Sequence, residues 1–180
     1  MIRFFDILFS AIGLLVLSPL FLILWLLIKL SSKGPGFFIQ ERIGLGGKPF
    51  GLYKFRSMRT NTESESLITI GEDDHRITRI GHFIRKYKLD ELPQLWNVLK
   101  GDMSLVGPRP EVRKYVEMYT PEQRKVLDVK PGITDYASIE YVNENELLGN
   151  AEDPDRVYVE QVMPNKLKLN MKYKIGRAHV

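Results

Sequence analysis

The stretch KLDELPQLWNVLKGDMSLVGPRP, residues 88–110, combines a helical pattern with two adjacent acids and a proline-flanked arginine. Apolar residues at helical spacing predict a short helix that ends at Gly101. The apolar set consists of Leu92, Leu95, Trp96 and Leu99. Asp90 is the predicted N-cap, and Pro93 fits the first turn, because an amide donor there would be unpaired anyway. The segment therefore predicts a capped helix followed by a loop.

The paired acids Asp90 and Glu91 allow two interpretations. In the simpler one they only cap the helix, which is an ordinary use of acids at that position. In the second, an ionised Asp90 attacks phosphorus while a cation neutralises the phosphate oxygens, since a helix N-terminus also attracts anions. Arg109 is the candidate cation, because Pro108 and Pro110 restrict its backbone and its guanidinium binds phosphate with planar geometry.

An uncharged apolar segment from Ile7 to Ile28, about 22 residues long, is sufficient to span a bilayer as a helix. A cleaved signal peptide fits it badly, because the run is too long and no small-residue cleavage site follows. Pro19, in its middle, removes one amide donor, and the hydroxyl of Ser18 is placed to bind a freed carbonyl. The segment therefore predicts a membrane helix that breaks at Ser18-Pro19.

Positive residues flank this segment on both sides, with Arg3 before it and Lys29 and Lys33 after it. Positive charge at both ends favours a re-entrant helix whose two ends are cytoplasmic. A simple transmembrane span stays open as the alternative.

Residues 36–58 contain two extended stretches around a glycine-rich turn, which predicts a β-hairpin. Lys54 and Arg56 are expected on one face of the second strand, because alternate residues of a strand point the same way. The turn contains GLGGK, but Pro49 follows Lys48 where a P-loop needs Ser or Thr, which excludes that motif.

The polar stretch 61–73 predicts a loop. From Asp74 to Tyr87, isoleucines at helical spacing predict an amphipathic helix with a basic opposite face. The basic residues are Arg76, Arg79, Arg85 and Lys86. Such a face is commonly solvated, or lies on acidic headgroups when a membrane is near.

The 180 residues suffice for one domain with a hydrophobic core, and the net charge of +4 suits anionic partners. The absence of cysteine excludes disulfides, thiol nucleophiles and Cys-ligated zinc. The three histidines show no metal-ligand spacing. A membrane-tethered nucleic-acid binder would use the charge, but the chain lacks a stacking platform for bases, so no nucleic-acid partner is expected.

The second half of the chain contains several helix and turn signals. Thr120-Pro121 predicts the start of a short helix, and VKPGIT, residues 129–134, predicts a turn. Asp153-Pro154 predicts the start of a final helix that Pro164 interrupts.

Four motifs resemble, in order, those of the bacterial sugar transferases, the monotopic phosphoglycosyl transferases that act on polyprenyl phosphate. They are KFRSM (54–58), RITRIG (76–81), LDELPQLWNVLKGDMSLVGPRPE (89–111) and PGIT (131–134). The likeness extends from the N-terminal apolar segment to about Lys174, and the long central motif excludes a chance match. It favours the phosphate-handling interpretation of the acids.

The resemblance implies transfer of a phosphosugar from a nucleoside diphosphate sugar, usually a UDP-sugar, to undecaprenyl phosphate, with release of UMP. By the family motif, Asp90 is the covalent nucleophile, Glu91 assists it, and Mg²⁺ is held near Asp90. The phosphate-binding cations are then Lys54, Arg85 and Arg109, with Arg56 added as the neighbour of Lys54 on its strand face.

The predicted fold is α+β and mainly helical: a re-entrant membrane helix with a Ser-Pro break over residues 1–33, and a small cytoplasmic phosphoglycosyl transferase domain containing a β-hairpin over residues 34–174. Residues 175–180, IGRAHV, match the in-frame translation of a common sequencing adapter, so an artefact is expected there. The family's C-terminal amphipathic segment would then be missing.

The resemblance also implies a place in the bacterial inner (cytoplasmic) membrane, in contact with membrane lipids, with the catalytic domain on the cytoplasmic face. The pathway would build a surface glycan such as capsule, exopolysaccharide or lipopolysaccharide. DYAS after PGIT departs from the family's usual Gly and apolar residue, which bears on substrate choice. The sugar, the pathway and the oligomeric state, a homodimer included, stay open.

A rival hypothesis is a non-catalytic, membrane-anchored scaffold that binds acidic lipid through the basic helix. It leaves the Asp-Glu pair and the proline-flanked arginine without a purpose, and it predicts no release of UMP from any UDP-sugar.

Overall fold

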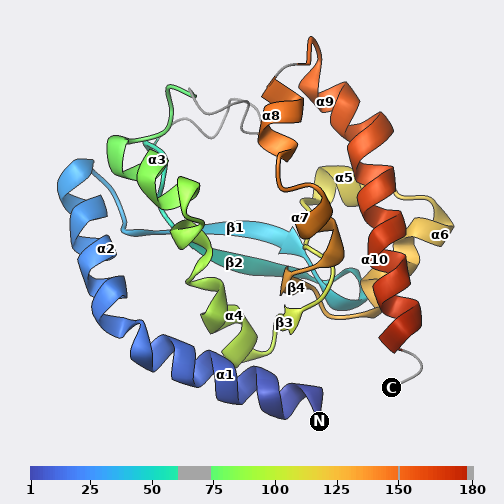
Figure 1. Cartoon of the computed structure of the whole chain (residues 1–180), viewed down its shortest axis with the longest axis horizontal. Helices are drawn as coiled ribbons and strands as arrows, with labels where there is room; N and C mark the ends of the chain where they lie inside the picture. The colour runs from blue at the N-terminus through green and yellow to red at the C-terminus, as the bar shows by residue number, and fades with distance from the viewer. Residues whose placement is uncertain (61–73, 150, 178–180) are drawn as a thin grey trace.

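The computed structural model describes residues 1–60, 74–149 and 151–177. The predicted loop at 61–73 and the last residues of the adapter-like stretch, 178–180, lie outside the described part. Figure 1 shows a bent pair of N-terminal helices curving around one side of a central hairpin, with the later helices on the other side.

The first half of the chain contains α1 (Ile2–Val16), α2 (Ser18–Ser31), β1 (Phe37–Ile43), the 3₁₀ turn η1 (Leu45–Gly47), β2 (Pro49–Phe55), α3 (Arg79–Lys86), the 3₁₀ turn η2 (Leu89–Glu91), α4 (Gln94–Lys100) and β3 (Ser104–Val106). The second half contains α5 (Arg113–Glu117), α6 (Pro121–Arg124), η3 (Lys125–Asp128), β4 (Gly132–Thr134), α7 (Tyr136–Glu140), α8 (Glu144–Gly149), α9 (Pro154–Val157), the π-helical turn η4 (Tyr158–Val162) and α10 (Met163–Arg177). The predicted class, mainly helical with a β-hairpin, is confirmed.

Two small two-stranded sheets lie between the helices (Figure 1). β1 and β2 form the predicted antiparallel hairpin, with Phe37 opposite Phe55 and Ile43 opposite Pro49. β3 and β4 pair in parallel. The prediction of a turn throughout residues 129–134 is therefore wrong for β4, because its strand partner lies far away in the chain and leaves no local signal.

The apolar N-terminal segment is broken where Ser18-Pro19 predicted. Pro19 cannot donate to the carbonyl of Leu15, and the Ser18 hydroxyl donates to that oxygen instead, at 2.7 Å. The helices on either side meet with a bend of 60°. Among the described residues no single helix is long and apolar enough to cross a bilayer, but α1 and α2 together satisfy the criterion by length and composition.

The start of α1 is fixed to the region that follows the paired acids. Arg3 donates to the carbonyls of Val98 and Leu99 at the end of α4, at 2.5 and 2.8 Å. The Asp6 carboxylate is buried and accepts hydrogen bonds from the Ser104 hydroxyl and the Leu105 amide. Arg3 is thus more than a flanking charge, since it binds two carbonyls in the last turn of α4.

The second helix packs on the domain through its other end. Leu24 and Ile28 of α2 are buried against Phe55 of β2 and Ile84 of α3. The start of α1 and the second half of α2 therefore both contact the same domain.

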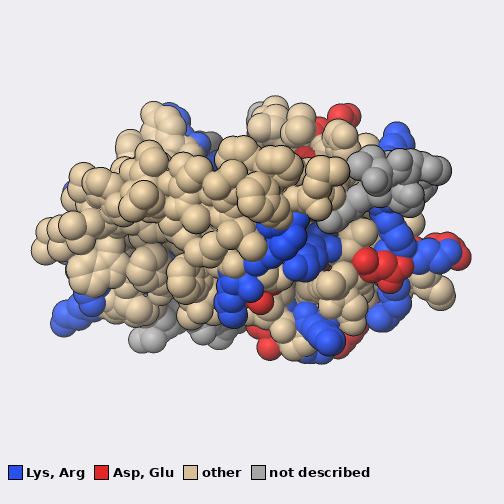
Figure 2. Space-filling view, turned by 90° about the horizontal axis from the view of Figure 1, so that it is seen from below, with Lys and Arg blue, Asp and Glu red and all other residues tan. Residues whose placement is uncertain are grey.

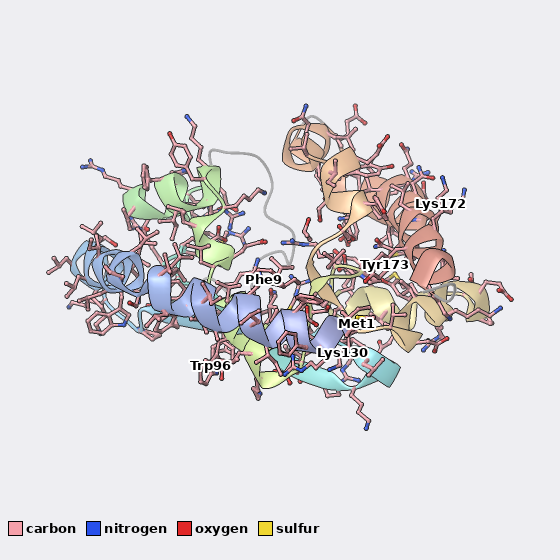
Figure 3. The ribbon with its side chains drawn as sticks, turned by 60° about the horizontal axis from the view of Figure 1, so that its bottom comes forward. Met1, Phe9, Trp96, Lys130, Lys172 and Tyr173 are labelled. Carbon is pink, nitrogen blue, oxygen red and sulfur yellow. The ribbon has the colours of Figure 1, made fainter. Side chains whose placement is uncertain are left out.

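The outer surface of α1 and α2 is apolar. Figure 2, which looks onto this side, shows a broad face without charge, bordered by Lys and Arg. Large hydrophobic side chains on these helices are exposed, among them Phe4, Phe9, Leu15, Leu22 and Leu30. In Figure 3, Phe9 lies along α1, Met1 lies at the end of α1 near Lys130, and the exposed Trp96 extends from α4 nearby. Such a patch on a protein surface marks contact with a membrane or another protein.

The central motif forms a helix that differs from the prediction at its start. Asp90 is not an N-cap: it lies within η2, and α4 begins four residues later at Gln94, with no side-chain cap. Gly101 ends the helix as predicted, with a φ of 104°. Glu91, Leu92 and Pro93 separate Asp90 from the first residue of α4, and Asp90 itself is buried.

The basic helix also begins later than predicted. α3 starts at Arg79, because Thr78 caps it by accepting a hydrogen bond from the Gly81 amide at 3.0 Å. Arg76 precedes the helix and is buried in an ion pair with Asp74 at 2.6 Å. It therefore does not join the predicted basic face.

The last helices surround a second core built around Tyr115, Tyr119, Tyr158 and Leu167. Thr120 forms the predicted cap of α6, with a reciprocal hydrogen-bond pair to Gln123. Pro164 does not break the final helix, because the π-helical turn η4 just before it accommodates the missing amide donor.

Candidate active site

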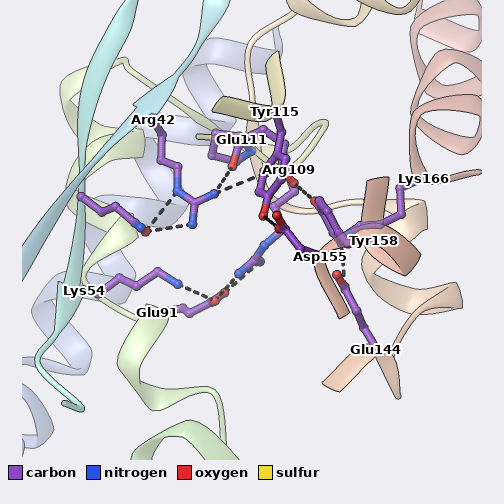
Figure 4. Close-up of polar contacts among 12 residues, drawn as sticks. Arg42, Lys54, Glu91, Arg109, Glu111, Tyr115, Glu144, Asp155, Tyr158 and Lys166 are labelled. Carbon is purple, nitrogen blue, oxygen red and sulfur yellow. Dashed lines mark hydrogen bonds and ion pairs between the residues drawn. The ribbon is translucent and has the colours of Figure 1, made fainter. Parts of the chain in front are cut away.

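Glu91 is the centre of a charged group contributed by three segments. Its Oε1 accepts a hydrogen bond from Lys54 Nζ of β2 at 3.0 Å. Arg109 binds both carboxylate oxygens, with Nη1 3.1 Å from Oε2 and Nη2 bonded to Oε1 (Figure 4). A bidentate pair of this kind is strong and holds the guanidinium in one orientation. The structure thus brings together three predicted site residues that are distant in the chain.

The charges in this group shift one another's ionisation. Burial alone would raise the pKa of Glu91, but attraction and hydrogen bonds from Lys54 and Arg109 outweigh it and hold that pKa well below its usual range. Burial lowers the pKa of Lys54 in spite of its attraction to Glu91. Glu91 is therefore a firmly ionised carboxylate and a poor proton acceptor, bound to two cations.

The backbone that carries Arg109 is held by close contact between β3 and β4. The Gly107 amide donates to the Thr134 carbonyl and the Gly132 amide to the Pro108 carbonyl, both at 3.0 Å. A Cβ at Gly132 would lie 2.1 Å from the Gly107 nitrogen, so the two segments approach this closely only because Gly132 is glycine.

Asp135, the first residue of the unusual DYAS sequence, supports the same loop. One carboxylate oxygen accepts a hydrogen bond from the Arg109 amide at 3.1 Å. The other caps α7 by accepting one from the Ser138 amide at 2.7 Å. Asp135 therefore contacts the backbone of a predicted phosphate-binding residue.

Asp90 is buried beside this group, with 6% of its surface exposed. Among the described residues its carboxylate makes no hydrogen bond and no ion pair. Burial raises the pKa of Asp90 and the neighbouring Glu91 raises it further, whereas Lys54, Arg85 and Lys88 oppose the shift. A carboxylate without a partner, surrounded by cations, suits a nucleophile that must approach a phosphate group.

Arg42 is a site residue that the sequence analysis missed. It lies on β1, where Nη1 donates to the Pro110 carbonyl at 3.2 Å and lies 3.6 Å from Glu111 Oε2. The hairpin register places it on the same face as Lys54. Gln40 and Arg42 are two residues apart in the strand and therefore lie on the same face of it. This alternation of polar residues was the sequence signal that could have indicated Arg42.

Arg56 does not join the site, so its predicted phosphate-binding role is corrected. It lies just beyond β2, and its guanidinium donates to the carbonyls of Lys33, Ser32 and Ile28 at 2.9, 2.8 and 3.2 Å. Those oxygens lie in the last turn of α2 and in the two residues that follow it, where the helix end carries partial negative charge. Strand alternation fails for this residue because the strand has already ended at Phe55.

A pocket of about 580 Å³ opens beside the charged group. Its cationic and acidic lining residues are Arg42, Arg85, Lys88, Glu91, Arg109, Glu111, Glu144 and Lys166. Arg85 and Arg109, two of the residues predicted to bind phosphate, line it, whereas Lys54 and Asp90 do not. The volume is typical of a small-molecule site, for which about 300–1,000 Å³ is usual.

The described residues offer limited ligands for the predicted Mg²⁺. They contain no cluster of three or more His, Asp or Glu side chains that would hold a metal alone. Both oxygens of Glu91 are occupied by cations, whereas the Asp90 carboxylate has no partner among the described residues. This fits Mg²⁺, which is commonly held by one or two carboxylates together with substrate phosphates and water.

Comparison with known proteins assigns this arrangement to a family. A family model described as bacterial sugar transferase matches residues 1–175. The chain belongs to the bacterial sugar transferase family. The predicted family is confirmed. Two of the motifs on which that prediction depended, at residues 54–58 and 89–111, contain Lys54, Glu91 and Arg109 of the charged group.

Several curated relatives of this sugar transferase are similar in sequence. A putative undecaprenyl-phosphate N-acetylgalactosaminyl 1-phosphate transferase of Bacillus subtilis is 49% identical over 120 residues, 67% of each chain. The UDP-N-acetylgalactosamine-undecaprenyl-phosphate N-acetylgalactosaminephosphotransferase of Aeromonas hydrophila is 46% identical over 142 residues, 76% of this chain and 33% of the relative. The UDP-glucose:undecaprenyl-phosphate glucose-1-phosphate transferase of Escherichia coli is 42% identical over 141 residues, 74% of this chain and 30% of the relative.

This sugar transferase thus matches two thirds of one relative and about a third of the other two. All three names describe transfer of a sugar phosphate, so the predicted enzyme class, a phosphoglycosyl transferase, is confirmed.

Proposed function

We propose that this chain transfers a sugar phosphate from a UDP-sugar to undecaprenyl phosphate through a covalent intermediate on Asp90, releasing UMP. The observation that carries the proposal is the buried Asp90 carboxylate, which has no partner in the described part of the chain and lies beside the Glu91, Lys54 and Arg109 group. The names of the relatives, which include UDP-sugars and undecaprenyl phosphate, supply the substrate classes.

The reaction has two displacements at one phosphorus. In the first, an Asp90 oxygen forms a bond to the sugar-bearing phosphorus, and the bond from that phosphorus to the bridging oxygen breaks. UMP leaves with the electron pair. In the second, an oxygen of the lipid phosphate attacks the same phosphorus and the bond to Asp90 breaks, which regenerates the carboxylate and forms a lipid diphosphate sugar. No proton transfer is needed in either displacement, because both leaving groups depart as stable anions.

The cations lower the barrier for an anion attacking an anion. Glu91 orients Lys54 and Arg109. When the diphosphate binds, these two cations exchange the Glu91 carboxylate for diphosphate oxygens. Arg85 and Arg42 line the pocket and add to the positive electrostatic potential there. Mg²⁺ bound by Asp90 and the diphosphate would neutralise further charge on the transferred phosphoryl group.

The apolar bent helix pair supports an active site at a membrane surface. In this proposal, α1 and α2 enter the inner membrane from the cytoplasmic side and return, which keeps the pocket in the cytosol within reach of a lipid phosphate. The apolar outer face of the pair and the attachment of Arg3 and Asp6 to the domain support this orientation.

The test is mass spectrometry of the protein after incubation with UDP-sugars and no lipid. We expect a phosphosugar adduct that maps to Asp90, and UMP released in equal amount. Asp90→Asn should form no adduct and show no turnover, because an amide is a poor nucleophile toward phosphorus. Glu91→Gln should form the adduct slowly, since Lys54 and Arg109 lose the carboxylate that positions them.

Asp102→Asn is the matched control. This acid lies at the other end of α4, where its carboxylate is 3.1 Å from Lys100 Nζ and accepts from Asn97. Its variant should form the adduct at close to the wild-type rate. An adduct on Glu91 or Asp102, or UMP release that requires both substrates at once without any adduct, would overturn the mechanism.

A further inference from the structure

The pocket continues well beyond the catalytic cations. At one end it is lined by Glu91 and Arg109, and at the other by Glu144 of α8, Tyr158 of η4 and Lys166 of α10. Figure 4 shows the two ends side by side, with Arg109 between the Glu91 group and the three distal residues. A diphosphate needs only the cationic end, so the distal end is available to another part of the substrate.

The distal end holds a close ion pair. Lys166 Nζ lies 2.9 Å from Glu144 Oε2, with 10% and 24% of the two side chains exposed. Within the described part of the chain, the second carboxylate oxygen of Glu144 has no hydrogen-bond partner. Removing such a pair from water is unfavourable unless the remaining lone pairs and protons also find partners. A ligand that supplies those partners would stabilise the pair.

The aromatic wall beside the pair is fixed in position. The Tyr158 hydroxyl donates to Glu111 Oε1, and its ring packs against that of Tyr115 at 4.8 Å between centroids. Lys166 Nζ lies 5.7 Å from the centre of the Tyr158 ring. The distal end therefore combines a hydrogen-bond acceptor and a hydrogen-bond donor beside a fixed aromatic ring.

This combination suits neutral hydroxyl groups better than a phosphate. A hydroxyl can donate to the carboxylate of Glu144 and accept from the ammonium of Lys166, so two adjacent hydroxyls satisfy both. A phosphate at the same place would be repelled by Glu144 and by Glu111. We infer that Glu144 and Lys166 bind adjacent hydroxyl groups of the nucleotide sugar and so determine which substrate is accepted, an inference that rests on the proposed function.

Adjacent hydroxyls occur both on the transferred hexose and on the ribose of UMP. The two sources are distinguished by comparing UDP-glucose, UDP-N-acetylgalactosamine and UMP as ligands. Contact with the hexose affects only the UDP-sugars, whereas contact with the ribose affects all three ligands alike.

The experiment measures binding by calorimetry in an Asp90→Asn background, in which the UDP-sugars should not be consumed. Adding Glu144→Gln or Lys166→Gln should raise the Kd of at least one UDP-sugar by about tenfold or more, since each change removes a hydrogen bond to a charged group. An unchanged Kd for UMP assigns the hexose, and a parallel increase assigns the ribose. Unchanged values for all three ligands, or no binding of any UDP-sugar to the parent, would overturn the inference.

Lys174→Gln is the control on the same helix. Lys174 Nζ lies 2.6 Å from Asp128 Oδ2, and neither residue lines the pocket, so this change should leave every Kd unchanged. The double exchange Glu144→Lys with Lys166→Glu addresses a purely structural role. It keeps an ion pair and should preserve the melting temperature, but it reverses donor and acceptor. If it binds UDP-sugars like its parent, the pair is structural and the inference fails. Adduct formation on Asp90 tests the reaction separately.

Discussion

Arg109 and Glu91, 18 residues apart, form a bidentate ion pair, while Asp90, directly beside Glu91 in the chain, is buried without an ion pair among the described residues. Two adjacent acids thus have opposite environments. Burial and Glu91 raise the pKa of Asp90, and two cations hold that of Glu91 low. Neighbouring carboxylates with divergent pKa values are typical of sites in which each has a separate task.

The first prediction concerns pH. In the proposed mechanism Asp90 attacks as the ionised carboxylate, so we expect activity to be lost as pH falls through its raised pKa. Lys54 opposes that rise, and Lys54→Gln should therefore move the acidic limb of the kcat/KM profile to higher pH. Lys54→Arg keeps the charge and should leave the midpoint near that of the wild type. A midpoint that stays constant in Lys54→Gln would show that Asp90 is not the group that titrates.

The second prediction concerns Arg109. Arg109→Lys keeps the charge but loses the planar pair of donors to Glu91. Loss of one hydrogen bond between charged groups, about 1.5–3 kcal/mol, corresponds to a fall in kcat/KM of about 10- to 150-fold. Steady-state UMP release measures it. Wild-type activity would assign Arg109 a purely structural role.

The third prediction concerns membrane topology. The chain has no cysteine, so single cysteines report without background. Cysteines placed at Ile2, the first residue of α1, and at Lys130, which lies near Met1 in Figure 3, should react with an impermeant reagent from one side only. Reaction of the Ile2 position from the periplasm alone would contradict the re-entrant arrangement. Pro19→Leu should straighten the helix and move part of the population toward that outcome.

The fourth prediction concerns the attachment of α1. Asp6→Ala leaves the Ser104 hydroxyl and the Leu105 amide without their acceptor and should destabilise the protein by about 1–3 kcal/mol. Thermal unfolding in detergent measures this. Ser10→Ala is the matched control, since that buried hydroxyl bonds only to carbonyls of its own helix and its loss should cost less. Equal melting temperatures for the two variants would show that the Asp6 contacts add no stability.

Local sequence determined the elements whose signals lie within a few residues. The break at Ser18-Pro19, the end of α4 at Gly101 and the cap at Thr120 follow from covalent geometry and short-range hydrogen bonds, and the structure contains all three. The hairpin also followed from local alternation and a glycine-rich turn. The family motifs alone indicated Asp90, Glu91 and Arg109 as site residues.

Only the tertiary structure decided which charges meet. Lys54 and Arg56 are two residues apart, yet one reaches Glu91 and the other binds the end of α2, because the strand ends between them. Arg42 enters the site through strand pairing. Arg109 is placed by hydrogen bonds from the Gly107 amide to Thr134 and from the Gly132 amide to Pro108. The paired segments are distant in the chain, and neither carries a local signal for this contact. Sequence specifies backbone preferences over a turn or two, whereas pairing of distant charges depends on the packing of the whole chain.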